Sequence, residues 1–247
     1  MRYFLTALQF LTILSLKRVD PPPCEKDLRD SMALFPLVGC VLGGVLISMD
    51  YILRDVLPGS VATVFVLATH ILLTGALHVD GFTDTIDGIA GGGTPQERLR
   101  IMRDSHTGAV GTAMLILLLL TKFLTMDAIS GEWRWRVFFL FPVVGRWAMV
   151  VMASGAGYAR RDGGLGRAFA GNAGWVLSVA TGVGGLVVVL ILGLKGLFMM
   201  AMVGIVAYIF TRFFISKLGG VTGDVFGFQC ETAELFFLIL FLILYRV

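Results

Sequence analysis

The sequence predicts an all-α integral membrane protein with about seven transmembrane helices. Of its 247 residues, 57% are hydrophobic and only 15% are charged, and the mean hydropathy is +0.86. Soluble domains are about 45–50% apolar and about 25% charged. Apolar blocks long enough to cross a bilayer as helices recur along the chain, without the alternation of a membrane β-barrel. The composition therefore argues against a soluble globule and against a disordered chain.

Seven apolar blocks carry this prediction, and no internal repeat divides them. Residues 2–16 form an additional apolar stretch that is short for a span, and we expect an interfacial or re-entrant helix there. We expect a single membrane domain over residues 1–247. The last block is short and can begin earlier than its apolar core. The expected blocks are 34–53, 61–79, 109–129, 137–154, 173–194, 196–211 and 233–245.

Lysine and arginine residues predict the orientation. With the N-terminus in the cytoplasm, the inside segments hold 13 of these residues and the outside segments hold 5. This split favours an N-in, C-out orientation. It also places segments 80–108, 155–172 and 212–232, which are rich in glycine and charge, on the same cytoplasmic face.

Two further features exclude other classes of protein. The net charge of +3 is too small to predict a nucleic-acid partner. Cys24, Cys40 and Cys230 are far apart and odd in number, so they indicate neither a zinc site nor a disulfide framework.

The strongest chemical signal is an acidic cluster in residues 75–93. Asp80, Asp84 and Asp87 are spaced i, i+4, i+7 and fall on one helix face. Carboxylates this close repel one another unless a cation neutralises them, and charge beside a bilayer is costly. Hard oxygen ligands favour Mg²⁺, with Mn²⁺ or Ca²⁺ as alternatives. The other interpretation is a solvated acidic first turn of a helix.

A basic helix is expected directly after this cluster. Thr94 and Glu97 form a capping box around Pro95 at the first helical position. Arginine side chains bind phosphate bidentately, although arginines here also fit the ordinary excess of positive charge on the inside. Together with the acids, they predict a site for a diphosphate with its Mg²⁺. The arginines are Arg98, Arg100 and Arg103.

Other polar residues interrupt the apolar sequence. The glycine-rich turn 219–234 offers Thr222, Gly223 and Asp224 as substrate contacts, with Asp224 also a candidate metal ligand. Arg146 lies inside an apolar block, where it is either a phosphate contact or a snorkelling side chain. Arg160, beside Arg161, is either a phosphate contact or a topology signal.

We expect different roles for the three histidines. His78 precedes Asp80 by two residues, about 160° away on a continuous helix, so a break at Gly75 or Gly81 is needed to bring it to the acids. It remains a candidate general base or orienting residue, and His106 is a second. For His70, deeper in its block, we expect a hydrogen bond between helices. No nucleophile paired with a base is evident, so we expect no covalent intermediate.

These motifs resemble the cobalamin synthase family, also called adenosylcobinamide-GDP ribazoletransferase. The similarity covers LHVDGFTDTIDG, RLRIMRDSHTGAVG and GGVTGDVFG, and also the opening FLTALQFLTILSLKR, FPLVGCVLGG, PVVGRWAMV and YARRDGGLG. It therefore runs along nearly the whole chain in the expected order. At His106 we expect arginine in many members. The matching positions are His78, Asp80, Asp84, Asp87, Arg98, Arg103, Asp104 and Asp224.

The resemblance implies an integral membrane enzyme that completes the nucleotide loop of cobalamin. Such an enzyme joins adenosylcobinamide-GDP to the 5′-oxygen of α-ribazole, or of its 5′-phosphate, and releases GMP, with Mg²⁺ as cofactor. The metal would be held by Asp80, Asp84, Asp87 and Asp224, and the phosphates by Arg98 and Arg103. A homo-oligomer, or a complex with other cobalamin-assembly enzymes, is compatible with this role.

Two rival functions differ in class. Asp84-x-x-Asp87-Gly88 matches the front of the CDP-alcohol phosphotransferase motif, but the rest of that motif is not found at its spacing. An ion-coupled transporter would place carboxylates near the bilayer midplane in helices of related halves. Here the acids follow the end of a block, and no repeat is evident.

Overall fold

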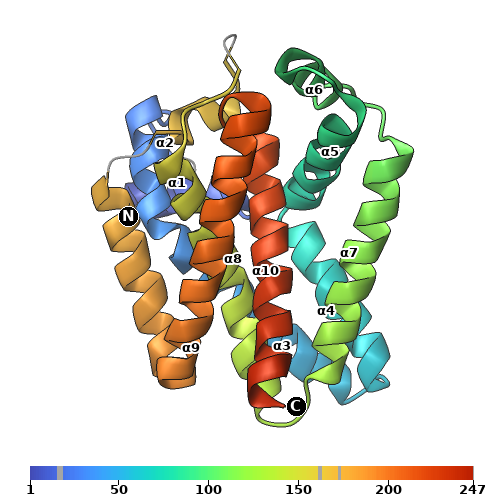
Figure 1. Ribbon diagram of the computed structural model, residues 1–247. Coiled ribbons are helices and arrows are strands. Elements are labelled where there is room, and N and C mark those ends of the chain that lie inside the picture. Colours follow the sequence, from blue (N-terminus) through green and yellow to red (C-terminus); the bar gives the residue numbers. More distant parts are fainter. Residues whose placement is uncertain (16–18, 161–162, 172–173, 247) are drawn as a thin grey trace.

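The computed structural model describes residues 1–15, 19–160, 163–171 and 174–246. These residues form helices and no strand, which confirms the all-α prediction (Figure 1). Lys17, Arg18 and Arg161 from the charge count lie outside the described residues. The helices are α1 (Arg2–Leu11), α2 (Glu25–Ser31), η1 (Met32–Leu34), α3 (Phe35–Arg54), α4 (Gly59–Leu73), α5 (Leu77–Gly91), α6 (Pro95–Ile101), α7 (Ala109–Ala128), α8 (Trp133–Gly155), η2 (Leu165–Phe169), α9 (Gly174–Leu218) and α10 (Gly223–Tyr245).

Five helical segments are long and apolar enough to cross a membrane, and a sixth candidate is the bent pair α4 and α5. One of the five, α9, has 45 residues and if straight would extend about 67 Å, more than twice the thickness of a hydrocarbon core. It breaks at Gly193, whose φ is 63°. Its two arms lie side by side, since a Cβ on Gly184 would lie 3.3 Å from the Met200 side chain. The described residues thus hold five or six candidate spans, against about seven predicted crossings, with the broken α9 counted as one.

The expectation of one span over residues 61–79 is wrong. Gly75 and Ala76 have φ values of 59° and 57°, in the left-handed region, and they end α4. The chain restarts as α5 at an angle of 84° to α4. The acidic segment therefore belongs to a separate helix rather than to the end of a straight span or a loop. The helix that contains the last block, α10, begins at Gly223. This is ten residues before the apolar core at residue 233, in agreement with the expectation that the helix can begin earlier.

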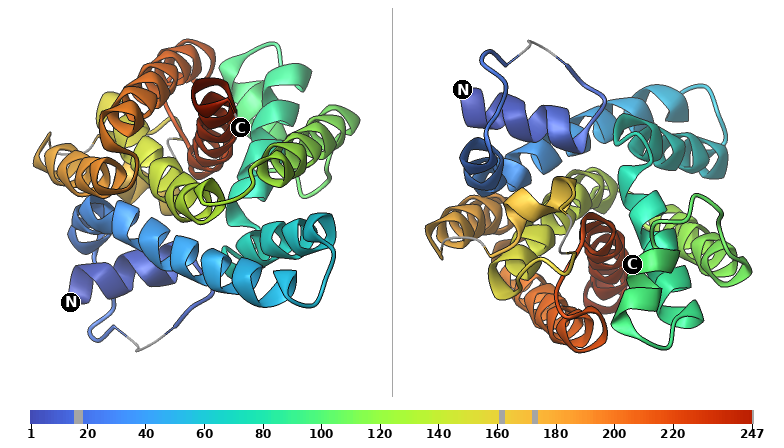
Figure 2. Two further views of the ribbon diagram at one scale, coloured as in Figure 1. Left: turned by 90° about the horizontal axis from the view of Figure 1, so that it is seen from below. Right: turned by 90° about the horizontal axis from the view of Figure 1, so that it is seen from above.

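The segments predicted to share a face do so. Figure 1 shows α6, the connection between α8 and α9, and the start of α10 at the same end of the bundle. The C-terminus lies at the opposite end (Figure 1). Figure 2 views the bundle along its axis, with α8 among the other helices and α10 beside it. The α8 helix packs against α3, α9 and α10.

The interior holds a charge-balanced cluster. The Lys122 ammonium of α7 donates to Glu231 at 2.5 Å and to Glu234 at 2.6 Å, both on α10. Arg146 of α8 donates to the other oxygen of Glu234. His70 Nε2 lies 3.2 Å from Arg146 Nη1, which confirms the hydrogen bond between helices that we expected for His70. All five side chains are almost completely buried.

Close packing of α3 on α8 gives a first testable prediction. A Cβ on Gly43 would lie 2.3 Å from the carbonyl oxygen of Phe139, whereas a Cβ on Gly44 would meet nothing within 4 Å. Gly43→Ala should therefore lower the melting temperature in detergent, at a cost of about 1–3 kcal/mol for overpacking. Gly44→Ala is the matched control and should leave it nearly unchanged. Equal melting temperatures for the two variants would contradict this contact between backbones.

Candidate active site

The acidic cluster lies on α5 as the spacing predicts. Asp80, Asp84 and Asp87 all belong to this one helix, with Asp80 exposed and the other two partly buried. The charges acting on Asp84 come from Asp80, Asp87, Asp224 and Arg160. The structure therefore brings the fourth predicted carboxylate, Asp224 of α10, to the same place as the three on α5.

Glycines allow this approach of α5 to α10. A Cβ on Gly81 would lie 2.8 Å from the carbonyl oxygen of Asp224, and a Cβ on Gly227 would lie 2.9 Å from that of His78. Real side chains cannot occupy such positions, so the two backbones meet only because both residues are glycine. This contact fixes Asp224 beside the acidic face of α5.

The start of α7 orients Asp87. The backbone N–H of Gly108 donates to one carboxylate oxygen at 2.7 Å, and that of Gly111 to the other at 2.8 Å. The N-terminus of a helix carries partial positive charge, which stabilises a carboxylate. Each oxygen keeps a second lone pair that can bind a cation.

Arg160 and Thr222 hold Asp224. The Arg160 guanidinium donates to Asp224 Oδ2 at 2.6 Å, and the Thr222 hydroxyl donates to the same oxygen at 3.2 Å. Thr222 also caps α10 by accepting from the N–H of Val225. Gly223 approaches Gly166 closely, since a Cβ on Gly166 would lie 2.7 Å from the Gly223 nitrogen.

The predicted arginines divide into two roles. Arg98 donates to the carbonyl oxygens of Gly92 at 2.9 Å and Lys217 at 3.0 Å, which ties α6 to the end of α9. Arg100, Arg103 and Arg160 instead line a cavity of about 410 Å³. Arg98 does not line this basic cavity, where three guanidinium groups lie together.

Asp104 lies at the edge of the site and pairs with His106. The two side chains are 2.7 Å apart and both are exposed. The hydrogen bonds from His106 hold the pKa of the Asp104 carboxyl below its ordinary value. Asp104 and Asp87 line a common surface hollow of about 300 Å³.

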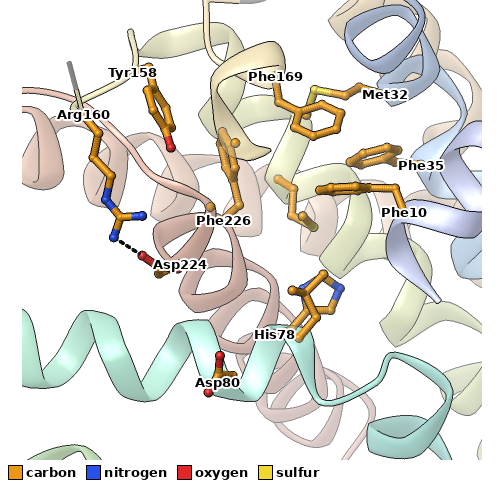
Figure 3. A pocket seen from close by; sticks show the side chains of 14 residues that line it. Phe10, Met32, Phe35, His78, Asp80, Tyr158, Arg160, Phe169, Asp224 and Phe226 are labelled. Carbon is orange, nitrogen blue, oxygen red and sulfur yellow. Dashed lines mark hydrogen bonds and ion pairs between the residues drawn. The ribbon is translucent and has the colours of Figure 1, made fainter. Parts of the chain in front are cut away.

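An aromatic pocket that the sequence did not reveal adjoins these groups (Figure 3). It has a volume of about 210 Å³ and contacts α1, α3, α5, η2 and α10. Phe10, Phe35 and Phe169 gather at one side, and the Arg160–Asp224 pair lies at the other (Figure 3). Arg160 lines both this pocket and the basic cavity.

Comparison with known proteins identifies the family. Residues 3–242 match the family described as cobalamin-5-phosphate synthase. The chain belongs to this family. Similar proteins include the adenosylcobinamide-GDP ribazoletransferase of Geotalea daltonii, 39% identical and aligned over 95% of this chain and 94% of the relative. Those of Acetivibrio thermocellus and Pseudomonas entomophila are each 36% identical, over 88% and 88%, and over 94% and 95%, of the two chains. No solved structure matches the chain.

In this cobalamin-5-phosphate synthase family member, two sequence assignments besides that of Arg98 need correction. Arg146 is not a phosphate contact, because it is fully buried and donates to Glu234 in the interior cluster. His78 does not turn toward the acidic face, because α5 is continuous through Gly81. Its side chain is 1% exposed and lines the aromatic pocket instead.

The residues that this family member brings together suit a divalent cation only in part. The donors are carboxylates, the ligand type that Mg²⁺ and Mn²⁺ prefer. In the described part of the chain, however, no three His, Cys, Asp or Glu side chains stand close enough to form a metal cage. Mg²⁺ is commonly bound by one or two carboxylates together with substrate phosphates and water, so a cage made only of protein groups is not required.

Some site residues escaped the sequence reasoning. Tyr158 and Phe226 line the aromatic pocket, but isolated aromatic residues between membrane segments carry no periodic signal. Phe10 lies on α1, which was predicted only as a membrane-associated helix. A usable signal did exist for the interior cluster, because Lys122 and Arg146 inside apolar blocks require acidic partners, and α10 carries Glu231 and Glu234.

Proposed function

We propose that this protein is an adenosylcobinamide-GDP ribazoletransferase. It would transfer the cobinamide phosphate of adenosylcobinamide-GDP to a free ribose hydroxyl of α-ribazole, or of α-ribazole 5′-phosphate, and release GMP. The 5′-oxygen expected from the sequence cannot serve for the second acceptor, because its 5′-oxygen is already esterified. One observation carries the proposal: the carboxylates of α5 and Asp224 adjoin, through Arg160, a cavity lined by Arg100 and Arg103. The names of the relatives support the same activity.

The reaction is a substitution at phosphorus. A ribose hydroxyl oxygen of the acceptor forms a bond to the cobinamide-bound phosphorus, and the bond from that phosphorus to the bridging oxygen breaks, so that GMP leaves with that oxygen. The proton of this hydroxyl passes to a carboxylate oxygen of the acidic cluster that holds no metal ion. Arg100, Arg103 and Arg160 hold phosphate oxygens and stabilise the charge that develops on the leaving phosphate.

Mg²⁺ is the cofactor we propose for this site, with Mn²⁺ as a substitute. Asp80, Asp84 and Asp87 would hold it, and Asp224 would join them when phosphate draws Arg160 away from its carboxylate. When bound, the ion neutralises the diphosphate and orients it. The ordered Asp87 carboxylate, fixed by Gly108 and Gly111, would serve as the rigid ligand of this set.

We further propose that the site faces the cytoplasm from the inner membrane. The excess of basic residues on the segments at this end of the bundle supports that orientation. Phosphorylated substrates made in the cytoplasm would then reach the site without crossing the bilayer.

The decisive experiment is an assay of membranes that contain the protein. With adenosylcobinamide-GDP and α-ribazole, we expect equal amounts of GMP and completed cobalamin, and excess EDTA should abolish both until Mg²⁺ is restored. CDP-diacylglycerol with an alcohol acceptor is the control for the rival phospholipid enzyme and should give no CMP. Transfer that continues unchanged in EDTA would contradict the proposed role of a metal ion but not the proposed transfer activity.

A further inference from the structure

We propose that the aromatic pocket binds the base of the acceptor nucleoside. The inference rests on the proposed function, under which α-ribazole presents a dimethylated benzimidazole, a flat and largely apolar bicyclic ring. The aromatic and methionine side chains that line the pocket, apart from Tyr158, are Phe10, Met32, Phe35, Met149, Phe169 and Phe226.

The aromatic end of the pocket is formed by closely packed rings. The ring centroids of Phe10 and Phe169 are 4.4 Å apart, and those of Phe35 and Phe169 are 5.9 Å apart. Phe35 and Phe169 are each 1% exposed. A planar apolar base entering here gains ring contacts and loses little hydration, since ligand pockets bind mainly through apolar and aromatic walls.

His78 supplies the one buried polar group that such a base needs. Its Nε2 is buried without a hydrogen-bond partner in the described structure, and its ring is directed into the pocket (Figure 3). An orphaned buried nitrogen costs free energy until a ligand satisfies it. The base of α-ribazole has a single unsubstituted ring nitrogen, which accepts a hydrogen bond from His78 in the Nε2–H tautomer.

The other parts of the two substrates fit the pocket less well. Guanine carries several donors and several acceptors on its edges, and burial among phenylalanine and methionine side chains would leave most of them unpaired. The corrin macrocycle is too large for about 210 Å³, a volume below the usual range for ligand pockets. The basic cavity and the exposed side of α5 remain for these groups.

The polar end of the pocket then receives the ribose. Asp80, Asp224 and Arg160 line this end, opposite the three phenylalanines (Figure 3). A base held by the phenylalanines directs its sugar toward these residues. A free ribose hydroxyl thereby reaches the carboxylates and the phosphates bound beside Arg160, as the transfer requires.

Two variants test the assignment by steady-state kinetics in detergent-solubilised full-length protein. Phe169→Ala should raise KM for α-ribazole about tenfold or more, because the free energy of stacking a base on an aromatic ring corresponds to a change of that size in affinity. The same variant should change KM for adenosylcobinamide-GDP by less than about twofold. His78→Leu should also raise KM for α-ribazole with little change in kcat. Phe237→Ala, which truncates an equally buried phenylalanine outside the pocket, is the control for general loosening.

Binding of 5,6-dimethylbenzimidazole, measured by equilibrium dialysis, separates this inference from the proposed function. We expect the wild-type protein and the Phe237→Ala variant to bind it and the Phe169→Ala variant to bind it at least tenfold more weakly. If no transfer occurs but this pattern is found, the proposed function fails and the pocket assignment stands. A rise in KM for adenosylcobinamide-GDP alone, a fall in kcat alone for His78→Leu, or equal binding by all three proteins overturns the assignment.

Discussion

Asp84→Asn should reduce transfer more than 100-fold while the protein still inserts into the membrane. Asp84 has the most central position of the cluster, since the charges of Asp80, Asp87 and Asp224 all act on it. Asparagine preserves its shape but removes the charge that a divalent cation and its diphosphate require. Loss of groups that merely orient metal ligands costs about 10–100-fold, so the loss of a direct ligand should exceed that range. The measurement is the initial rate of GMP release at saturating substrates, with the amount of inserted protein as reference.

The matched control for this variant is Asp55→Asn. Asp55 is an exposed aspartate at the end of α3, in the turn to α4 and away from the acidic cluster. The Asp55→Asn variant should release GMP at the wild-type rate. Asp84→Asn should also melt at nearly the wild-type temperature in detergent, because no hydrogen bond within the described structure depends on its carboxylate. Unreduced transfer by Asp84→Asn, at every Mg²⁺ concentration tried, would remove the acidic face of α5 from the mechanism.

Sequence alone could locate this cluster because its information is local. The i, i+4, i+7 spacing on a helix places three carboxylates together whatever the rest of the chain does. The meeting of Gly81 with Gly227 could not be predicted in the same way, because it joins α5 to α10 across more than 140 residues. Glycines are also too frequent in this chain for one pair to stand out, with 31 in the sequence.

The bend between α4 and α5 shows a second limit. Hydropathy continues through residues 61–79 because both helices are apolar there, so the block looks like one span. The break depends on left-handed φ values at Gly75 and Ala76, and alanine gives no warning of such a conformation.

The hydrogen-bond partners of Arg98 could not be predicted from one sequence either. Arg98 was assigned to phosphate for its charge, yet the structure commits it to two backbone carbonyl oxygens.

Replacement of Glu234 by leucine should lower the stability of the fold strongly, to about the same extent with and without bound substrates. Glu234→Leu leaves Arg146 and Lys122 with Glu231 as their remaining carboxylate, so one buried cation loses its counter-charge. Removal of one partner from a buried ion pair costs about 3–5 kcal/mol. The expected result is a large fall in the melting temperature in detergent, or a failure to accumulate in membranes. Glu132→Leu is the matched control, because Glu132 pairs with Arg136 at an exposed site, where an ion pair contributes at most about 1 kcal/mol.

A double variant separates the effect of charge balance from the effect of packing in the interior cluster. In Arg146→Met with Glu234→Leu, the buried pair Lys122 and Glu231 remains and is neutral. The double variant should therefore be more stable than either single variant, since it leaves no unpaired charge in the bundle. If the two losses of stability simply add, the cluster acts through packing of each side chain. If the double variant recovers, pairing of charge is what holds α7, α8 and α10 together, and the role of Arg146 is that pairing rather than contact with phosphate.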